Sequence, residues 1–294
     1  MTARERLGRA WRAWVELLDR RESPTALALV RILLASVLLA DYLDLWHAGL
    51  LDSLYAPPPQ GFAIGEAWLS GHAAWLLGTI SLAAVVVGLA TPLACVGYVA
   101  ASAALSHLTP DGESALDMLS RIVFLILALS RCNAKWAIDA WLWRRLGREV
   151  PAEIPAWPRY LLMLQLVWVY FSGGMNKSSG AWGPQGGFTA LANALSDPHA
   201  ARFSPEWVGV IYPLTRIATA LTMAFELGAP LFLIAYARAW RWRWIWIALG
   251  VSFEVGIAVG LRLGSFPYGM LALYPVLLRP EDFTFRARAT LDRT

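Results

Sequence analysis

Apolar runs long enough to cross a membrane are the feature that most constrains how this chain can fold. Eight runs rich in Leu, Ile, Val, Ala and aromatic residues alternate with polar or charged segments. Hydrophobic residues make up 57% of the 294 positions, charged residues make up 16%, and the mean hydropathy is +0.49, beyond the usual range of soluble domains. The 16 tryptophans gather near the ends of the runs, as membrane-interface residues do. The sequence therefore predicts an all-α integral membrane protein, a polytopic helical bundle.

Polar segments between the runs set approximate span boundaries. We expect a single domain over 1–294, with an N-terminal segment at 1–21, a bundle over 25–278 and a tail over 279–294. The fifth run is short for a span, but aromatic residues extend it at both ends. The eight predicted spans are about 25–45, 72–90, 92–107, 115–130, 160–174, 211–236, 244–260 and 265–278.

The first 21 residues have the pattern of an amphipathic helix. Apolar side chains recur at helical spacing on one face, and arginines supply the charge. The segment has neither a long apolar core nor a small-residue cleavage site, so a cleaved signal peptide is not expected. We predict a helix that lies on the membrane surface. Its apolar residues are Leu7, Trp11, Trp14, Val15 and Leu18.

Lysine and arginine are unevenly distributed among the segments outside the spans. Segments rich in these residues alternate with segments that have few, as eight spans require. The positive-inside rule then predicts a protein of the bacterial cytoplasmic membrane with both termini in the cytoplasm. The rich segments are the N-terminus, 131–159, 238–243 and the tail, and the poor ones are 46–71, 108–114 and 175–210.

Cysteine and histidine give no sign of a metal centre. The two cysteines, Cys95 and Cys132, have no zinc or iron–sulfur spacing, and the four histidines are scattered. The net charge of +4 comes from arginines concentrated in particular loops. We therefore expect no metal and no nucleic-acid partner, and membrane lipids as the surroundings.

Two glutamates are predicted to lie at the same depth in the bundle. Glu226 comes ten residues before Tyr236 and Glu254 ten residues after Trp244, and a short turn joins these antiparallel spans. At about 1.5 Å per residue, both carboxylates lie roughly 15 Å into the bundle. They either pair with an arginine, share one proton or belong to a polar network that fixes helix packing. The candidate arginines are Arg31, Arg262 and Arg216, and Arg216 begins a polar stripe that continues through Thr219 and Thr222 to Glu226.

Asp117 and Arg121 lie four residues apart near the outer end of the fourth predicted span. This spacing puts both side chains on one face of a helix. An ion pair within the helix accounts for them, and we expect them to bind each other.

The segment 170–182 departs from the pattern of a plain membrane helix. Gly173 and Gly174 have no Cβ, so they allow another backbone to approach closely or the helix to end. Lys177 follows, where hydrocarbon gives way to polar surroundings, and two interpretations of it are open. It is either a snorkelling lysine or an amine that partial desolvation makes a usable base. The neighbours that could hydrogen-bond a neutral amine are Asn176 and Ser178.

Four stretches, taken together, resemble the vitamin K-dependent gamma-carboxylase family and its bacterial relatives, the horizontally transferred transmembrane (HTTM) domain proteins. They fall in the order of the family and cover most of the chain. Each stretch is weak by itself. They are Arg31-Ile-Leu-Leu, Trp136-Ala-Ile-Asp139-Ala, Val169-Tyr-Phe-Ser-Gly-Gly-Met-Asn-Lys177 with Trp182 following, and Phe266-Pro-Tyr-Gly-Met-Leu-Ala272 with Pro275.

The resemblance implies a membrane enzyme that uses a reduced quinone similar to vitamin K hydroquinone. In the carboxylases, a lysine in the motif that matches Lys177 deprotonates the hydroquinone. O2 then converts the cofactor into a base that removes a γ-proton from a glutamate of a peptide, and CO2 captures the carbanion. On this basis the expected catalytic residues are Lys177, Asp117 and Asn176, and the expected cofactor-binding residues are Gly173, Gly174, Trp182, Arg216, Glu226 and Glu254.

Three departures from the family bear on this interpretation. Asp117 stands near the position where the carboxylase has a histidine, and Glu254 stands where family members often carry another. Because the tail predicted after the eighth span is short (279–294), we do not expect the large extracytosolic domain that binds the substrate propeptide. The quinone half of the chemistry therefore carries over more readily than the glutamate half.

Three hypotheses of function remain open from the sequence. The first is an enzyme that deprotonates or oxidises a quinol and couples this to modifying a peptide or small molecule. The second is a non-enzymatic lipid- or peptide-binding membrane protein, such as an immunity or maturation factor. The third is a transporter with a polar path through Glu226 and Glu254, against which we find no inverted repeat.

Overall fold

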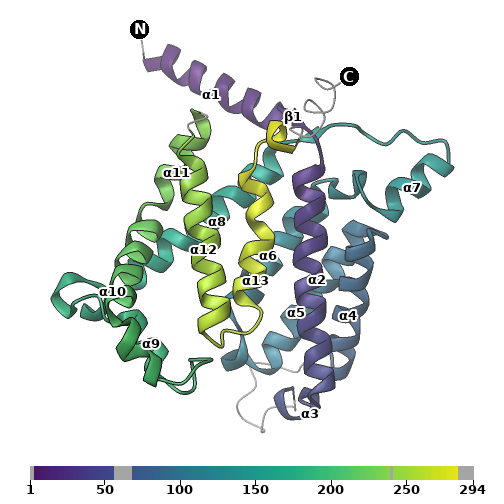
Figure 1. Cartoon of the computed structure of the whole chain (residues 1–294). Coiled ribbons are helices and arrows are strands. Elements are labelled where there is room, and N and C mark those ends of the chain that lie inside the picture. The colour runs from purple at the N-terminus through teal and green to yellow at the C-terminus, as the bar shows by residue number, and fades with distance from the viewer. Residues whose placement is uncertain (1–2, 56–67, 239–240, 284–294) are drawn as a thin grey trace, which may run out of the picture. The chain divides into compact units, whose positions relative to one another are not determined.

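The computed structural model describes residues 3–55, 68–238 and 241–283, and almost all of their secondary structure is helical (Figure 1). This confirms the predicted all-α class. The chain divides into two compact units, the first made of Met1–Leu162 with Ala272–Thr294 and the second of Met163–Leu271. Most of the predicted tail, from residue 284 onward, lies outside the described residues.

Within the described part of the chain, four helices are long and apolar enough to cross a membrane. Two shorter apolar segments, Gly71–Val87 and Phe266–Leu277, accompany them. Helical membrane segments are thus confirmed, whereas the count of eight spans and their orientation stay predictions. The four helices are α2 (Thr25–His47), α5 (Thr91–Leu108), α10 (Glu206–Leu227) and α12 (Arg243–Gly260).

Each predicted span coincides with a helix or with two consecutive helices. The exception to a simple match is the predicted span 211–236, which the structure divides at Gly228 into α10 and α11 (Ala229–Ala237). Pro230 explains the division, because proline lacks an N–H and its ring clashes with the carbonyl four residues earlier. The other matching elements are α4 (Gly71–Val87), α6 (Ala115–Leu129), α8 (Trp157–Asn176) and α13 (Phe266–Leu273) followed by the 3-10 turn η5 (Tyr274–Leu277).

Several short elements fall in segments for which the sequence predicts no regular structure. They lie in the connections between the longer helices, apart from η6, which follows the last of them. They are α3 (Leu51–Leu54), α7 (Ile138–Arg145), α9 (Ala190–Ser196), and the 3-10 turns η1 (Pro110–Gly112), η2 (Cys132–Ala134), η3 (Gly180–Trp182), η4 (Pro184–Gly186) and η6 (Pro280–Phe283).

The predicted N-terminal helix is present as α1 (Ala3–Asp19). Three of its apolar side chains, Trp11, Val15 and Leu18, are exposed, and so are Arg9 and Arg12. An apolar face left open to the surroundings suits a helix that lies in a membrane interface. Its interfacial location stays a prediction.

In the first unit, α4 packs against both α2 and α5, and α5 also packs against α6 (Figure 1). Gly78 allows the contact between α2 and α4, since a Cβ there would lie only 2.4 Å from the ring of Tyr42. Between α5 and α6, the hydroxyls of Tyr98 and Ser120 are 2.7 Å apart. These contacts place the core of the unit among the four helices, where Tyr98 and Phe124 are fully buried.

Arg31 and Asp139, which lie in two of the family-like stretches, have structural roles. Arg31 donates hydrogen bonds to the carbonyl oxygens of Val85 and Val86 at the end of α4 and to that of Trp136. Asp139 accepts hydrogen bonds from the backbone amides of Ala90 and Thr91 at 2.7 and 2.9 Å. Arg31 thus satisfies the last carbonyls of α4, and Asp139 satisfies amides at the start of α5. Arg31, a candidate partner of Glu226 and Glu254, belongs to the first unit, whereas both glutamates belong to the second.

The pKa of Asp139 reflects these bonds. Burial alone would raise the pKa of its carboxyl, but hydrogen bonds lower it below the ordinary value of 3.8. The donors are the Asn133 side chain, at 2.7 Å from the carboxylate, and the two backbone amides of the α4–α5 turn.

The predicted ion pair between Asp117 and Arg121 is wrong. Asp117 instead forms a capping box with Ser114, in which each side chain binds the other's backbone amide at the start of α6. Arg121 binds Glu113. The sequence spacing suited an intrahelical pair, but the unsatisfied amides of the helix start compete for the aspartate.

The first unit also contains a two-stranded antiparallel ladder that the sequence did not predict. Strand β1 (Arg21–Glu22) pairs antiparallel with β2 (Ile154–Pro155). Behind it, Arg159 forms two 2.6 Å bonds to the carboxylate of Glu22, and both side chains are buried. Arg159 also donates to the carbonyl oxygen of Val276 in η5. The bidentate geometry and the additional hydrogen bond compensate for burying the charges.

Candidate functional site

Helix α8 places the residues of the glycine–lysine motif on one face. Tyr170 and Lys177 are seven residues apart, which is about two helical turns, and the two glycines lie between them. The helix ends at Asn176, and the amide of Lys177 still bonds to the carbonyl oxygen of Gly174. Lys177 therefore extends from the last turn of an apolar helix.

Lys177 forms an ion pair with Glu226 of α10. Its Nζ lies 2.6 Å from both carboxylate oxygens, and the side chains are only 21% and 5% exposed, respectively. The Nζ also lies 5.0 Å from the ring centroid of Trp182, a cation–π distance. A snorkelling lysine would keep its head in water, so this geometry favours a structured polar site. Neither Asn176 nor Ser178, both exposed, contacts the amine within the part of the chain that the structure describes.

Gly173 and Gly174 allow α8 to approach α10 at this pair. A Cβ on Gly174 would lie 3.0 Å from the Cβ of Glu226 and 3.1 Å from a methyl group of Leu227, which is too close for ordinary packing. A Cβ on Gly173 would lie 3.6 Å from the Glu226 carboxylate and 3.8 Å from the Lys177 Nζ. Gly174 thus serves helix packing, whereas Gly173 leaves a small space in front of the ion pair.

Glu254 of α12 binds a different partner. Its Oε1 accepts a 2.6 Å hydrogen bond from the hydroxyl of Tyr170, and the carboxyl group is fully buried. Its Oε2 has no hydrogen-bond partner among the described residues. Glu226 and Lys177 are both near enough to influence Glu254 electrostatically. The two glutamates are therefore close enough to interact, but each carboxylate has its own partner, and their common depth in the membrane stays a prediction.

Tyr170 was missed as a site residue, although it belongs to the quoted motif. Its ring packs edge-on against Phe225 at 4.8 Å and against Trp246 at 5.8 Å between centroids. The available signal was its spacing of seven residues from Lys177, which places both side chains on the same helical face.

The polar stripe of α10 connects the helix to the loop that follows α8. Arg216 donates to the carbonyl oxygen of Gly187, and Thr219 accepts a hydrogen bond from the amide of Leu191 at the start of α9. Thr222 lines an apolar pocket. Among the described residues, Arg216 therefore forms no ion pair with a glutamate, and of the stripe it is Glu226 that pairs with Lys177.

An apolar pocket of about 430 Å³ lies among α9, α10 and α12. Phe225, which lines it, immediately precedes Glu226 on α10, and Thr222 lies four residues before that glutamate. On α12, Phe253 of the lining immediately precedes Glu254. Beside them, Gly256 lines the pocket with nothing within 4 Å of an added Cβ. The pocket can hold an apolar ring or chain beside the two helices that carry the carboxylates.

Asp117 is in the first unit and the other predicted catalytic residues, Lys177 and Asn176, are in the second. Its carboxylate caps α6. The structure therefore brings together Lys177, Trp182, Glu226 and the two glycines of the motif, with Glu254 and Tyr170 next to them, and gives Asp117, Asn176 and Arg216 other roles or surroundings.

The family comparison agrees with the helical architecture. Comparison with curated proteins and with solved structures gives no match. The model of the HTTM domain matches residues 19–281, which include all eight predicted spans. With several apolar helices, this match marks an integral membrane protein, and the chain belongs to the HTTM domain family.

Proposed function

We propose that the protein is a membrane enzyme that accepts a proton from a reduced quinone at the Lys177–Glu226 pair. The oxidation of the reduced quinone by O2 is then coupled to the modification of a peptide or small molecule, with CO2 as a further reactant if the modification is carboxylation. The observation that carries the proposal is the ion pair itself. The two Nζ–oxygen distances are 2.6 Å, and both side chains have low exposure. Lys177 directly follows the last residue of the apolar helix α8.

The two groups of the ion pair have different roles in the proposed proton transfer. The glutamate carboxylate has lone pairs that accept a proton, whereas the ammonium of Lys177 has none and stays positive. Once Glu226 is protonated, Lys177 is free to stabilise a negative oxygen beside it. This differs from the expected role of Lys177 as the base, because the structure gives the lysine a carboxylate partner.

The surroundings fit a molecule with a polar ring and an apolar chain. The space in front of Gly173 borders the ion pair, and the 430 Å³ pocket next to Phe225 is apolar. Glu254 Oε2, buried and unpartnered, offers an acceptor to a second hydroxyl. A reduced quinone bound there would supply an acidic hydroxyl group and two electrons for O2.

The proposal can be tested by identifying what the protein carries when it is purified. Mass spectrometry of bound lipids should find a quinone in near-stoichiometric amount. Gly256→Phe should deplete it, since the added ring fills the pocket, whereas Val255→Phe, on the exposed neighbouring position, should not. Co-purification of other lipids in place of a quinone, unchanged by Gly256→Phe, would favour the non-enzymatic binding protein.

A further inference from the structure

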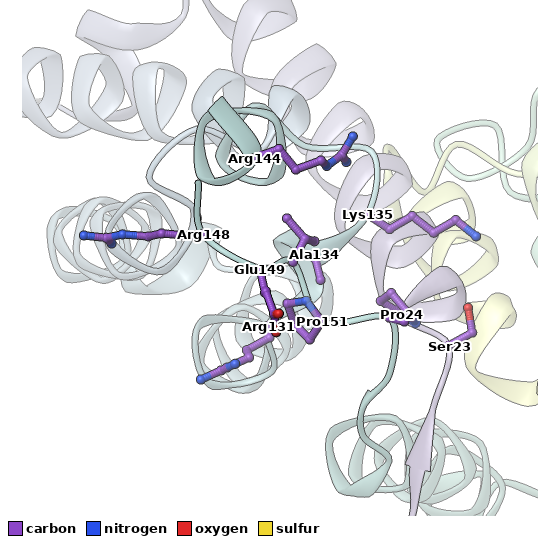
Figure 2. Close-up of a pocket in the computed structure, with 11 residues that line it drawn as sticks. Ser23, Pro24, Arg131, Ala134, Lys135, Arg144, Arg148, Glu149 and Pro151 are labelled. Atoms are coloured by element: carbon purple, nitrogen blue, oxygen red, sulfur yellow. The ribbon is translucent and has the colours of Figure 1, made fainter. Parts of the chain in front are cut away.

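A second, polar pocket lies at the end of the first unit where α2 begins and α6 has ended. Its volume is about 890 Å³, and its lining is less apolar than that of the pocket among α9, α10 and α12. Figure 2 shows the segment before α2 on one side, with Ser23 and Pro24, and the connector around α7 on the others. Both segments belong to the same compact unit.

The lining of this pocket is strongly basic. Four cationic side chains and one carboxylate, that of Glu149, give a formal charge of +3 (four positive minus one negative). Within the described residues, no carboxylate lies within ion-pair distance of any of the four cations. The four are Arg131, Lys135, Arg144 and Arg148.

One of the cations is held in place and three are free to turn. The Nζ of Lys135 donates to Thr25 Oγ1 at 2.7 Å, at the first residue of α2. The three arginines are exposed, and Figure 2 shows the charged ends of Arg131 and Arg148 pointing away from the other labelled lining residues and that of Arg144 pointing in another direction. Their long side chains can turn toward an anion, and no ion pair has to break for this to happen.

Exposed apolar side chains lie on the same segment of the chain as Arg144 and Arg148 of the lining, and we call them the apolar rim. Trp141, Leu142 and Leu146, on and just after α7, are 50%, 36% and 69% exposed. Such side chains next to water are unfavourable unless a membrane covers them. The pocket also lies beside the first residue of the membrane helix α2. Unpaired positive charge and an apolar rim at the end of a membrane helix together suit an anionic phospholipid.

We propose that the pocket lined by Arg131, Lys135, Arg144 and Arg148 binds a phosphate group, presented by an anionic phospholipid whose chains lie against the apolar rim of α7. Arg144 and Arg148 reach the phosphate from one segment of the connector, and Arg131 with Lys135 from another. Glu149 opposes binding because it places a negative charge in the same lining. The site is separate from the Lys177–Glu226 pair and does not depend on the enzymatic proposal.

The test measures lipid binding to the purified full-length protein by native mass spectrometry. Phosphatidylglycerol, phosphatidylcholine and soluble glycerol 3-phosphate are titrated separately. We expect phosphatidylglycerol to bind more tightly than the other two. Each arginine near an anionic headgroup contributes about fivefold in affinity, so the double variant Arg144→Gln/Arg148→Gln should weaken phosphatidylglycerol binding by roughly 25-fold.

Two further variants keep the test informative. Arg262→Gln removes an exposed arginine of the second unit that does not line the pocket, so it should bind phosphatidylglycerol as wild type does. Glu149→Gln should bind it more tightly, a change that misfolding would not produce. The proposal is overturned if the double variant binds as wild type, if phosphatidylcholine binds equally well, or if glycerol 3-phosphate alone matches the lipid, which would indicate a site for soluble anions.

Discussion

Removal of Glu226 from the ion pair should destabilise the protein far more than an ordinary surface substitution. In Glu226→Gln the ammonium of Lys177, 21% exposed, keeps its charge but loses a partner that binds it through two oxygens at 2.6 Å. At an effective dielectric constant of about 20, the attraction between unit charges at that distance is about 6 kcal/mol before desolvation is subtracted. Breaking a buried pair costs about 3–5 kcal/mol. The partial exposure of the lysine places the expected loss near the lower end, about 3 kcal/mol.

A double-mutant cycle isolates the pair from the packing around it. Thermal unfolding in detergent is compared for wild type, Glu226→Gln, Lys177→Met and the variant that carries both changes. Each single change leaves one unpaired charged group, whereas the double variant leaves none. The double variant should therefore be more stable than the sum of the single losses predicts, by about 1–3 kcal/mol. Strictly additive losses would refute the reasoning, because the two groups would then not interact.

Other consequences concern helix packing, pH and topology. Gly174→Ala should lower stability by about 1–3 kcal/mol through overpacking, whereas Gly173→Ala, with its nearest contacts at 3.6 Å or more, should fold like wild type in the same unfolding assay. The pKa of Asp139 is lower in the folded than in the unfolded protein, so its stabilising effect is complete above about pH 4 and is lost as the pH falls through the folded value. The unfolding temperatures of wild type and Asp139→Asn should differ at pH 7 and converge at acid pH, and a constant difference would contradict this assignment. A cysteine introduced at Ser196 should react with an impermeant reagent in intact cells, and one at Arg145 should not. Labelling of the second position would reverse the predicted orientation.

The helices could be predicted from the sequence because their signals are local. Apolar runs bounded by proline, glycine and charged residues mark α2, α4, α5, α6 and α12 to within a few residues. The break at Gly228 was missed because the apolar run continues through it, although Pro230 was the available signal. The strands β1 and β2 could not be predicted, since each has two residues and their pairing depends on segments far apart in the chain.

The candidate site shows a similar division. Lys177, Gly173 and Gly174 attract attention in the sequence because charged residues and paired glycines at the end of an apolar helix are unusual. The pairing of Lys177 with Glu226 joins residues 49 positions apart and depends on which faces of α8 and α10 meet. Arg216 was a candidate partner because it lies on the same helix as Glu226. Its guanidinium instead binds the carbonyl oxygen of Gly187, and helical periodicity cannot predict a contact with a loop.

Oxygen uptake with a reduced naphthoquinone tests the central proposal most directly. The wild-type protein in detergent should consume oxygen faster than the protein-free solution. Loss of a positioned base costs about 10²–10⁴-fold, so Glu226→Gln should fall to a rate near that of the blank. Lys177→Arg keeps the positive charge beside the carboxylate and should retain part of the rate, and Arg145→Gln, outside the site, should match wild type. A Glu226→Gln variant that consumes oxygen as fast as wild type, or a wild-type protein that consumes none with any quinol tried, would contradict the account.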